Sequence, residues 1–415
     1  MERLQVPRGT YDVLPEDADA RAALEATARR VLEGAGYRRI ETPTFEQTEV
    51  FTRGVGASTD IVQKEMYTFD DGGGRSVTLR PEGTAPICRA YVEHGMHKLP
   101  QPVKLWYLSS FFRSEKPQQG RFRQFWQLGV EAIGSDDPAV DAEVIVLLAT
   151  LLSELEVTGT RLRLASLGTP AARQDYRERL QAHLRANADQ LADDVRSRIE
   201  LNPLRAFDSD DPGTRAVMAG APLLLDHLDA DDAEHFATVR ELLDRAGVSY
   251  EIDPTLVRGL DYYTRTVFEF SSDALGAQSG VGGGGRYDGL VEMLGGPATP
   301  GCGWGAGVER ILLASAGLPV APPPVDLYVA FDAPAQRAAA FAVADEARHA
   351  RMNAQVELAG RSRKGQLKHA DRLGARYVAL VGDETTVLKD MQAGEQHDVP
   401  TDGLVARILR ERGMR

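Results

Sequence analysis

The first candidate site residues are an acidic and a hydroxyl side chain that follow a strand-like stretch. Residues 78–84 read Thr-Leu-Arg-Pro-Glu-Gly-Thr, and they place Glu82 and Thr84 on a loop just beyond a strand. An anion and a hydroxyl group there could hold a substrate ammonium group. Thr84 could instead cap the segment that follows, because a hydroxyl oxygen accepts a backbone N–H at a helix N-terminus. The residues alone leave both interpretations open.

Residues 112–131 read as a long hairpin with a turn at Gln118–Gly120. Successive side chains of a strand point to opposite faces, so the second strand would have a polar face and an apolar face. The polar face would carry Arg121, Arg123, Phe125, Gln127, Gly129 and Glu131, and the other face Phe122, Trp126, Leu128 and Val130. A polar face could simply be turned to water. An amide, a glycine and a carboxylate approaching the sheet centre favour a ligand cleft instead.

A third candidate lies in residues 257–263, Val-Arg-Gly-Leu-Asp-Tyr-Tyr, which bring Arg258 close to Tyr262 and Tyr263 before a strand. A guanidinium group suits anions, and a tyrosine hydroxyl can donate to or accept from a ring nitrogen. The alternative interpretation is a structural pair of Arg258 and Asp261 with packed tyrosines.

Glycine-rich runs in the last part of this region need a separate interpretation. Gly303–Arg310 leads into an apolar helix, and a cation such as Arg310 at the positive end of a helix indicates an anionic partner, with a surface salt bridge as the alternative. Gly280–Gly285 and Gly301–Ala306 fit a loose dinucleotide-binding pattern, but no strand feeds directly into either turn within a βαβ unit. The sequence has no Gly-x-x-x-x-Gly-Lys-Ser/Thr motif, so an ATP site would be of another kind.

The bulk composition limits the class of protein. The 415 residues are 43% hydrophobic and 26% charged, which is enough material for two or three globular domains. The net charge of −13 argues against indiscriminate coating of nucleic acid, although it leaves room for local RNA contacts. Cys88 and Cys302 have no second Cys or His at metal-ligand spacing, so two free thiols and no zinc site are expected. Met1–Pro15 lacks a secretory apolar region, and no run approaches about 18 apolar residues, which predicts a cytoplasmic protein without membrane contact.

The apolar periodicity predicts the elements that must position these residues. It predicts a helix over residues 16–33 and a second helix after Asp137-Pro138. Residues 37–134 are rich in Thr, Val, Tyr and Phe, with a further turn at Asp70–Gly74, which indicates hairpins of an antiparallel sheet.

Residues 170–248 have helical spacing, with breaks at Pro203, Pro212 and Pro222, and predict a helical insertion. Strand-like residues resume at 264–271, so the sheet is interrupted and then completed. The fold class is therefore α+β.

A proline-rich segment, Gly317–Pro324, indicates a stiff linker before a second domain. Beyond it, apolar runs at 327–331, 356–358 and 377–381 alternate with helix-like stretches near 333–351 and 362–373, as in a parallel sheet. The charge is also unevenly divided: residues 325–415 have a net charge of +1, and residues 1–324 have −14. Such asymmetry often separates domains with different partners.

Together these segments resemble class II aminoacyl-tRNA synthetases, and specifically the histidyl-tRNA synthetase family. Thr42–Glu46 is similar to the first class II motif with its dimer-interface proline, the 112–131 hairpin to the second, and Gly303–Arg310 to the third. Leu256–Tyr263 and Gly283–Leu290 are similar to the histidine-specific motifs of the family. The resemblance implies a catalytic domain at 1–322, with its helical insertion at about 170–250, and an anticodon-binding domain at 325–415.

The resemblance also implies site residues for each substrate. The residues implied for catalysis are Arg113, Arg258 and Arg310. Those implied for histidine are Glu82, Gly83, Thr84, Gln127, Glu131, Arg258, Tyr262 and Tyr263. Those implied for ATP are Arg113, Glu115, Arg121, Phe125 and Arg310. Those implied for tRNA are Lys116, Gln118, Arg121, Arg361, Arg363, Lys364 and Lys368.

The implied reaction is the activation of L-histidine with ATP and Mg²⁺, followed by transfer to the 3′ end of tRNA(His) by a homodimer. No protein ligand for the metal ion and no side-chain base for the transfer step is evident in the sequence. The alternative is a catalytically inactive, synthetase-like regulatory subunit of histidine biosynthesis. Such relatives typically lack the C-terminal domain and have a degraded Arg258 signature, whereas this sequence has both features. Another class II synthetase would lack the Tyr262-Tyr263 signature. Two departures from the family pattern are a short segment at Gly382–Lys389 and an extra glycine within Gly280–Gly285.

Overall fold

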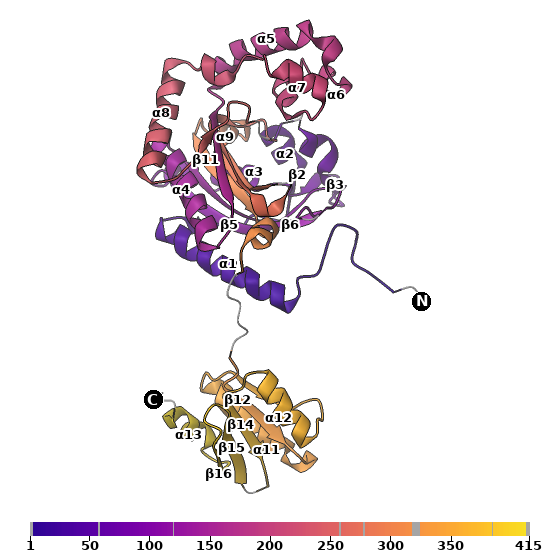
Figure 1. Cartoon of the computed structure of the whole chain (residues 1–415), viewed down its shortest axis with the longest axis vertical. Coiled ribbons are helices and arrows are strands. Elements are labelled where there is room, and N and C mark those ends of the chain that lie inside the picture. The colour runs from indigo at the N-terminus through magenta and orange to yellow at the C-terminus, as the bar shows by residue number, and fades with distance from the viewer. Residues whose placement is uncertain are drawn as a thin grey trace. The chain divides into compact units, whose positions relative to one another are not determined.

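The computed structural model describes residues 3–56, 59–118, 120–256, 259–276, 279–317, 324–383 and 385–411, without the side chain of Asp208. The chain forms two compact units, Met1–Pro319 and Val320–Arg415 (Figure 1). The predicted linker falls largely outside the described residues. No described helix is both long enough and apolar enough to cross a membrane.

A mainly antiparallel sheet of eight described strands organises the first unit. Its order is β1 (Arg38–Arg39), β5 (Val103–Phe112), β6 (Gln124–Ile133), β11 (Gly301–Gly307), β10 (Gly280–Arg286), β9 (Thr264–Ser272), β7 (Thr160–Ser166) and β8 (Glu251–Ile252). Only the short outer strands β1 and β8 pair in parallel with their neighbours. Strands β7 and β9 come from either side of the helical insertion and pair with each other, so the sheet is completed as expected.

The glycine-rich runs are the central strands β10 and β11. Their backbones approach so closely that a Cβ atom on Gly284 would overlap the carbonyl oxygen of Gly303. Glycine is required at such a position because any side chain would displace the neighbouring strand. The expectation that these runs are not dinucleotide-binding loops is confirmed.

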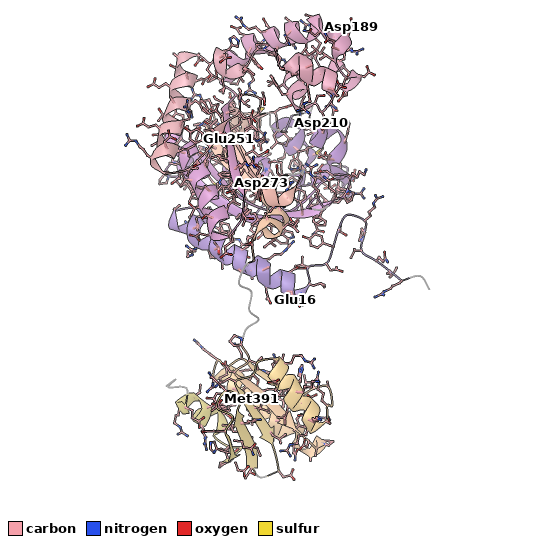
Figure 2. The ribbon with its side chains drawn as sticks, viewed as in Figure 1. Glu16, Asp189, Asp210, Glu251, Asp273 and Met391 are labelled. Atoms are coloured by element: carbon pink, nitrogen blue, oxygen red, sulfur yellow. The ribbon has the colours of Figure 1, made fainter. Side chains whose placement is uncertain are left out.

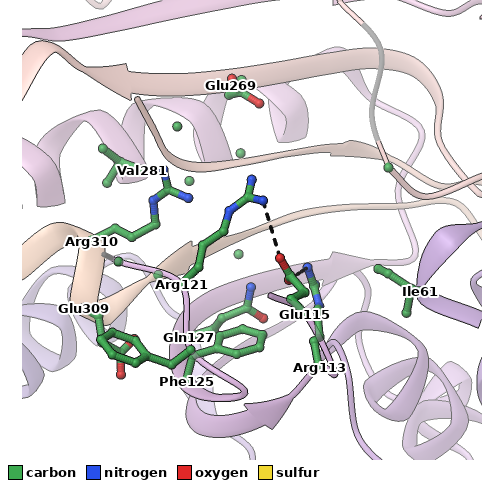
Figure 3. A pocket seen from close by; sticks show the side chains of 18 of the residues that line it. Ile61, Arg113, Glu115, Arg121, Phe125, Gln127, Glu269, Val281, Glu309 and Arg310 are labelled. Carbon is green, nitrogen blue, oxygen red and sulfur yellow. Dashed lines mark hydrogen bonds and ion pairs between the residues drawn. The ribbon is translucent and has the colours of Figure 1, made fainter. Parts of the chain in front are cut away.

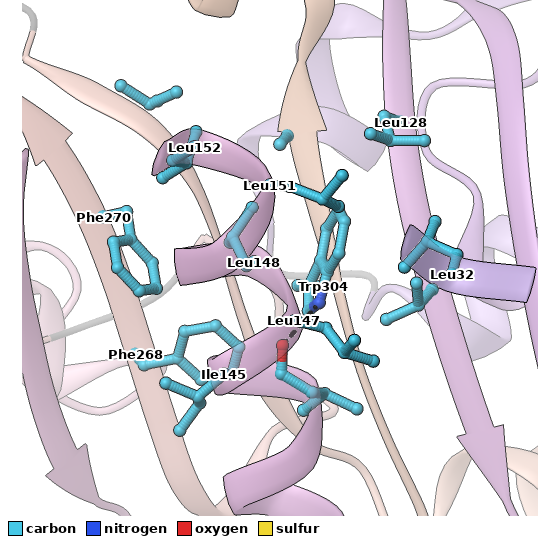
Figure 4. Close-up of a cluster of buried hydrophobic side chains, with 14 of the residues drawn as sticks. Leu32, Leu128, Ile145, Leu147, Leu148, Leu151, Leu152, Phe268, Phe270 and Trp304 are labelled. Carbon is cyan, nitrogen blue, oxygen red and sulfur yellow. Dashed lines mark hydrogen bonds between the residues drawn. The ribbon is translucent and has the colours of Figure 1, made fainter. Parts of the chain in front are cut away.

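Two predicted helices, α1 (Pro15–Gly34) and α4 (Pro138–Glu154), are confirmed. Asp137 caps α4 by accepting a hydrogen bond from the backbone N–H of Ala139 at 2.8 Å. Helix α4 lies across one face of the sheet, where its leucines pack against Trp304, Phe268 and Phe270 (Figure 4). Along β6, Gln127, Gly129 and Glu131 alternate with the core residues Leu128 and Val130, so these three positions face the opposite side of the sheet.

A smaller sheet of three described strands has the order β2 (Phe45–Gln47), β4 (Ser76–Leu79) and β3 (Tyr67–Asp70). The turn predicted at 70–74 joins β3 to β4, and Asp70 Oδ1 accepts hydrogen bonds from Gly72 N and Gly74 N.

The expectation of hairpins throughout 37–134 is wrong, because this stretch also contains two α-helices and a parallel strand. The helices are α2 (Thr48–Gly54) and α3 (Thr84–Glu93), with a π-helical turn at Ile61–Glu65 and a 3₁₀ turn at Met96–Lys98. Burial on several sides lets β-branched and aromatic residues stay helical in α3.

The insertion is helical, as predicted. It contains α5 (Pro170–Ala186), α6 (Asp193–Arg196), α7 (Pro212–Met218) and α8 (Ala230–Arg245), with 3₁₀ turns at Ala188–Gln190, Pro203–Asp208 and Leu224–His227. Pro203 and Pro212 each begin a helix, the position where a missing N–H costs least. The first unit is completed by a 3₁₀ turn at Asp273–Leu275 and by α9 (Leu290–Met293) and α10 (Val308–Ala314).

The second unit has a five-stranded sheet among its described residues, in the order β13 (Ala354–Val356), β12 (Leu327–Phe331), β14 (Tyr377–Val381), β15 (Thr385–Asp390) and β16 (Gln396–Pro400). A 3₁₀ turn at Pro334–Gln336 and helices α11 (Arg337–His349), α12 (Arg363–Arg372) and α13 (Leu404–Glu411) accompany it. The predicted strands at 327–331 and 377–381 and the parallel pairing are confirmed, but the middle strand is Ala354–Val356 and not 356–358, because it ends at Val356 and Leu358 is 82% exposed. The antiparallel strands β15 and β16 were not predicted.

The surface of the first unit carries the acidic excess noted in the sequence. Glu16, Asp189, Asp210, Glu251 and Asp273 are labelled in Figure 2, and all five are exposed. They lie on different helices, strands and loops rather than in one cluster.

Candidate active site

A cleft of about 600 Å³ opens beside the central strands of the first unit. Glycines of β10 and β11 form one wall, and side chains of the 112–131 hairpin form another (Figure 3). Among the predicted site residues, six line it: Arg113, Glu115, Arg121, Phe125, Gln127 and Arg310. The cleft therefore combines several guanidinium groups with an aromatic ring and an amide.

Two arginines of the hairpin loop form long ion pairs with the same carboxylate. Arg121 and Arg113 lie 3.4 Å and 3.8 Å from the carboxylate of Glu115. The Arg113 guanidinium lies over the Phe125 ring at 5.3 Å, and its Nε donates to Pro81 O at 2.9 Å. Lys116 and Gln118 are exposed on the same loop.

The predicted polar face of the second strand needs one correction. Strand β6 begins at Gln124, so Arg121 and Arg123 precede it and do not share the strand's alternation. The backbone N–H of Arg123 instead donates to Gly9 O at 2.7 Å. Phe125 and Gln127 do line the cleft, and Glu131 lies deeper and is fully buried.

Glu82 and Glu131 form a buried acidic pair near this cleft. Glu82 accepts hydrogen bonds from the first backbone N–H groups of α3, Thr84 N at 2.8 Å and Ala85 N at 2.9 Å. The helix-capping group is therefore the Glu82 carboxylate, and the alternative that Thr84 caps the helix is wrong. The Thr84 hydroxyl instead donates to Glu131 Oε1 at 2.7 Å. Burial raises the pKa of Glu82.

Glu131 receives a second hydrogen bond from Tyr287, whose hydroxyl donates to Oε2 at 2.5 Å. Burial raises the pKa of Glu131 to about 8, and the nearby charge of Glu82 acts in the same direction. Sequence reasoning gave Tyr287 no role, although it stands inside the Gly283–Leu290 motif. The contact joins residues 156 positions apart, so only the pairing of strands could reveal it.

Aromatic rings enclose this acidic pair. The Tyr262 and Tyr263 ring centroids are 4.7 Å apart, and Tyr287 lies 5.8 Å from Tyr262. The Tyr262 hydroxyl is 3.5 Å from Glu82 Oε2, and burial raises the pKa of this tyrosine well above its usual range. Arg258, predicted beside these tyrosines, lies outside the described residues.

Arg310 is the third residue of α10 and points into the cleft (Figure 3). Burial lowers its pKa, and the positive charge of Arg121 lowers it further. Two guanidinium groups directed into one partly buried space favour an anion there. The preceding residue, Glu309, also lines the cleft and was not predicted as a site residue.

The basic residues predicted for RNA lie in the second unit. Arg361, Arg363, Lys364 and Lys368 are exposed at the start of α12 and along it. Arg361 pairs with Glu357 at 3.1 Å, and Arg363 lies 3.7 Å from Asp332.

Within the described residues, no group of three or more His, Cys, Asp or Glu side chains could hold a metal ion. Cys88 and Cys302 are both buried and free.

Comparison with known proteins gives a consistent family assignment. A family model described as "Histidyl-tRNA synthetase" matches residues 9–311, and one described as "Anticodon binding domain" matches residues 324–411. The chain is 48% identical to the histidine–tRNA ligase of Desulfitobacterium hafniense over 96% of each chain. It is 49% identical to that of Halorhodospira halophila over 98% of this chain and 97% of the relative.

Among solved structures, apo histidyl-tRNA synthetase from S. aureus matches with a TM-score of 0.82 and 35% identity, over 98% of this chain and 100% of that chain. The antiparallel sheet and its motifs place the chain among the class II aminoacyl-tRNA synthetases. Within that class, the chain belongs to the histidyl-tRNA synthetase family.

Proposed function

We propose that this protein activates L-histidine with ATP and transfers it to the 3′ end of tRNA(His). The observation that carries the proposal is the buried carboxyl group of Glu131, which is held by two hydroxyl donors close to a cleft lined by arginines. A carboxyl group fixed in this way suits an N–H of a small ring, and the arginines suit a triphosphate. Residues 1–322 would form the catalytic domain and residues 325–415 the anticodon-binding domain.

Histidine would occupy the buried end of the site. Glu82, Thr84 and Gln127 would hold its ammonium group, and Glu131 and Tyr263 would pair with the imidazole nitrogens. A Cβ atom on Gly83 would lie 2.6 Å from the Tyr107 ring, so glycine keeps the loop close to the pocket wall. A site that pairs each polar atom of its ligand rejects analogues that lack one by about 10⁴ to 10⁵.

ATP would occupy the open end. Phe125 would stack on the adenine, Arg113 would bind the α-phosphate and Arg310 the γ-phosphate, with Glu115 and Arg121 beside them. Arg258 would supply a further cation opposite Arg113. Mg²⁺ prefers oxygen ligands and often uses one or two carboxylates together with substrate phosphates, which fits Glu115 and Glu269 in the cleft wall. When bound, the ion would neutralise phosphate charge; the proposal includes no zinc.

In the first step, a histidine carboxylate oxygen would form a bond to the α-phosphorus as the bond to pyrophosphate breaks. No side chain acts as a nucleophile. The arginines lower the barrier by holding two anions together and by stabilising charge that develops on the α-phosphoryl oxygens.

In the second step, a ribose hydroxyl of the terminal adenosine would attack the histidyl carbonyl carbon and release AMP. Lys116, Gln118 and Arg121 would contact the acceptor end, and Arg361, Arg363, Lys364 and Lys368 the anticodon region. Exposed cations serve this purpose because phosphate contacts position RNA.

The protein would act in the cytoplasm as a homodimer, since closed two-fold symmetry is the commonest arrangement of soluble oligomers. The exposed rings of Phe45 and Phe69 have centroids 6.2 Å apart, and Phe45 follows Pro43 of the first motif by two residues, which supports an interface on the small sheet.

The decisive experiment is ATP–pyrophosphate exchange with each of the twenty amino acids, followed by charging of tRNA(His). We expect exchange with histidine alone, and its loss in Arg258→Ala. Folded protein that supports no exchange with any amino acid would overturn the proposal and favour the regulatory-subunit alternative.

A further inference from the structure

The carboxylate of Glu309 joins three separate elements of the first unit beside the ATP end of the cleft. Its Oε1 accepts hydrogen bonds from the Tyr11 hydroxyl at 2.6 Å and from the Arg21 guanidinium at 2.8 Å. Both of its oxygens accept the backbone N–H of Trp126 at 3.1 Å. Glu309 is only 7% exposed, so this carboxylate depends on these partners for its solvation.

The Glu309 carboxylate accepts a backbone N–H of strand β6 at the point where β11 no longer pairs with β6. The β11–β6 ladder ends at the pair Gly307 and Gln127, after which the chain enters α10. Glu309 takes up the N–H of the next β6 residue, Trp126. Trp126 stands between Phe125 and Gln127, which both line the cleft. The carboxylate therefore fixes the backbone between two proposed substrate contacts.

The N-terminal segment adds a contact to the hairpin loop. Gly9 O accepts the backbone N–H of Arg123 at 2.7 Å, and the Tyr11 ring lies 4.5 Å from the Phe122 ring. Gly9 has a φ of +88°, and a Cβ atom there would lie 2.8 Å from side-chain carbons of Pro117 and Arg123. The segment is thus fitted closely against the loop that carries Glu115 and Arg121.

We propose that Tyr11, Arg21 and Glu309 form a clasp that positions the hairpin loop and the start of α10 for ATP. Arg113 and Arg310 stand on these two elements, and both must reach one triphosphate. The inference rests on the proposed function, because it assigns these two arginines to ATP. The three clasp residues are positioning residues, since they act through the backbone and loop they hold. Arg21 also lies over the Trp126 ring at 5.5 Å, which ties α1 to the same point.

The test compares Tyr11→Phe with Tyr176→Phe. Each change removes one hydroxyl from a tyrosine and keeps its ring. The Tyr176 hydroxyl donates to Pro222 O at 3.0 Å within the helical insertion, far from the clasp in the fold. The measurements are calorimetric titration with ATP and Mg²⁺, pyrophosphate exchange with separate KM values for ATP and histidine, and thermal unfolding.

We expect Tyr11→Phe to weaken ATP binding and raise the KM for ATP by about threefold to thirtyfold, because one hydrogen bond to a charged group is lost. The KM for histidine should change less than about twofold. Tyr176→Phe should lower the Tm by a similar amount and leave both KM values unchanged. Glu309→Gln, which loses the charge opposite Arg21, should shift ATP binding in the same direction as Tyr11→Phe.

Unchanged ATP binding in both Tyr11→Phe and Glu309→Gln would overturn the clasp, and so would an equal rise of both KM values, which indicates a general loss of structure. Failure of the proposed function has a different signature, namely wild-type protein without exchange for any amino acid. The calorimetric titration decides the clasp in that case too.

Discussion

The two ends of the site are built in different ways. At the buried end, the Glu82 and Glu131 carboxylates are enclosed by aromatic rings and accept hydrogen bonds of 2.5 to 2.9 Å from hydroxyl and backbone groups. At the open end, Arg113 and Arg121 make ion pairs of 3.4 to 3.8 Å with one partly exposed carboxylate. Short, fixed hydrogen bonds suit the recognition of one small ligand, whereas guanidinium groups gathered along an open cleft suit a larger anionic ligand.

Because of this difference, we expect the buried end and the open end of the site to contribute to different steps, ligand discrimination and catalysis. A buried polar group left unpaired costs far more than an exposed ion pair contributes, so the buried end should discriminate between ligands. The open end should accelerate the activation step, because its positioned cations stabilise charge that develops in the transition state. Substitutions at the two ends should therefore affect different kinetic constants.

The largest effect is expected at the buried end. Glu131→Leu leaves Tyr287, Thr84 and the ligand without their shared acceptor, so kcat/KM for histidine should fall by about 10⁴. Glu131→Gln keeps an acceptor oxygen and should lose less. Pyrophosphate exchange at varied histidine concentration measures both. Equal losses in the two variants would show that shape rather than hydrogen bonding sets the selectivity.

An intermediate effect is expected at the open end. Arg310→Ala removes a cation aimed into the cleft, and kcat should fall by about 10² to 10³, as for other charge-stabilising groups. Histidine binding, measured by calorimetry without ATP, should be nearly unchanged. A matching loss of histidine affinity would mean that the two ends are not separable.

The effect that is smallest for each step of the experiment, one pH unit, concerns stability. Burial raises the pKa of Glu131 from the ordinary 4.5 to about 8, so the folded protein keeps a proton that the unfolded chain releases. The resulting stabilisation is complete below about pH 4.5 and is lost as pH rises through about 8. Between these values, the free energy of unfolding of the wild type should fall relative to that of Glu131→Gln by at most about 1.4 kcal/mol per pH unit. Urea titrations at several pH values measure this difference, and parallel curves for the two proteins would contradict the buried, protonated state.

Local sequence patterns were sufficient for elements whose signals lie within a few residues of each other. Asp137-Pro138 marks the start of α4 correctly, because the cap and the missing proline N–H both act within the first turn. The strands at 327–331 and 377–381 were found at their full length from their apolar runs. Helix α2 was missed, and α3 was offered only as the alternative in which a helix starts at Thr84, because the helical state of both depends on burial rather than on propensity.

The sequence by itself determined which chemical groups are present: the Glu82-Gly83-Thr84 loop, the hairpin cations and Arg310 at a helix start. Only the tertiary structure decided which of them meet. Tyr287 reaches Glu131 across 156 positions, beside strands whose order in the sheet does not follow the chain, and Tyr11 reaches Glu309 across 298, where the N-terminal segment meets the start of α10. Such contacts depend on how distant elements pair and pack, and no local pattern encodes them, since the entropic cost of closing a loop rises only slowly with its length.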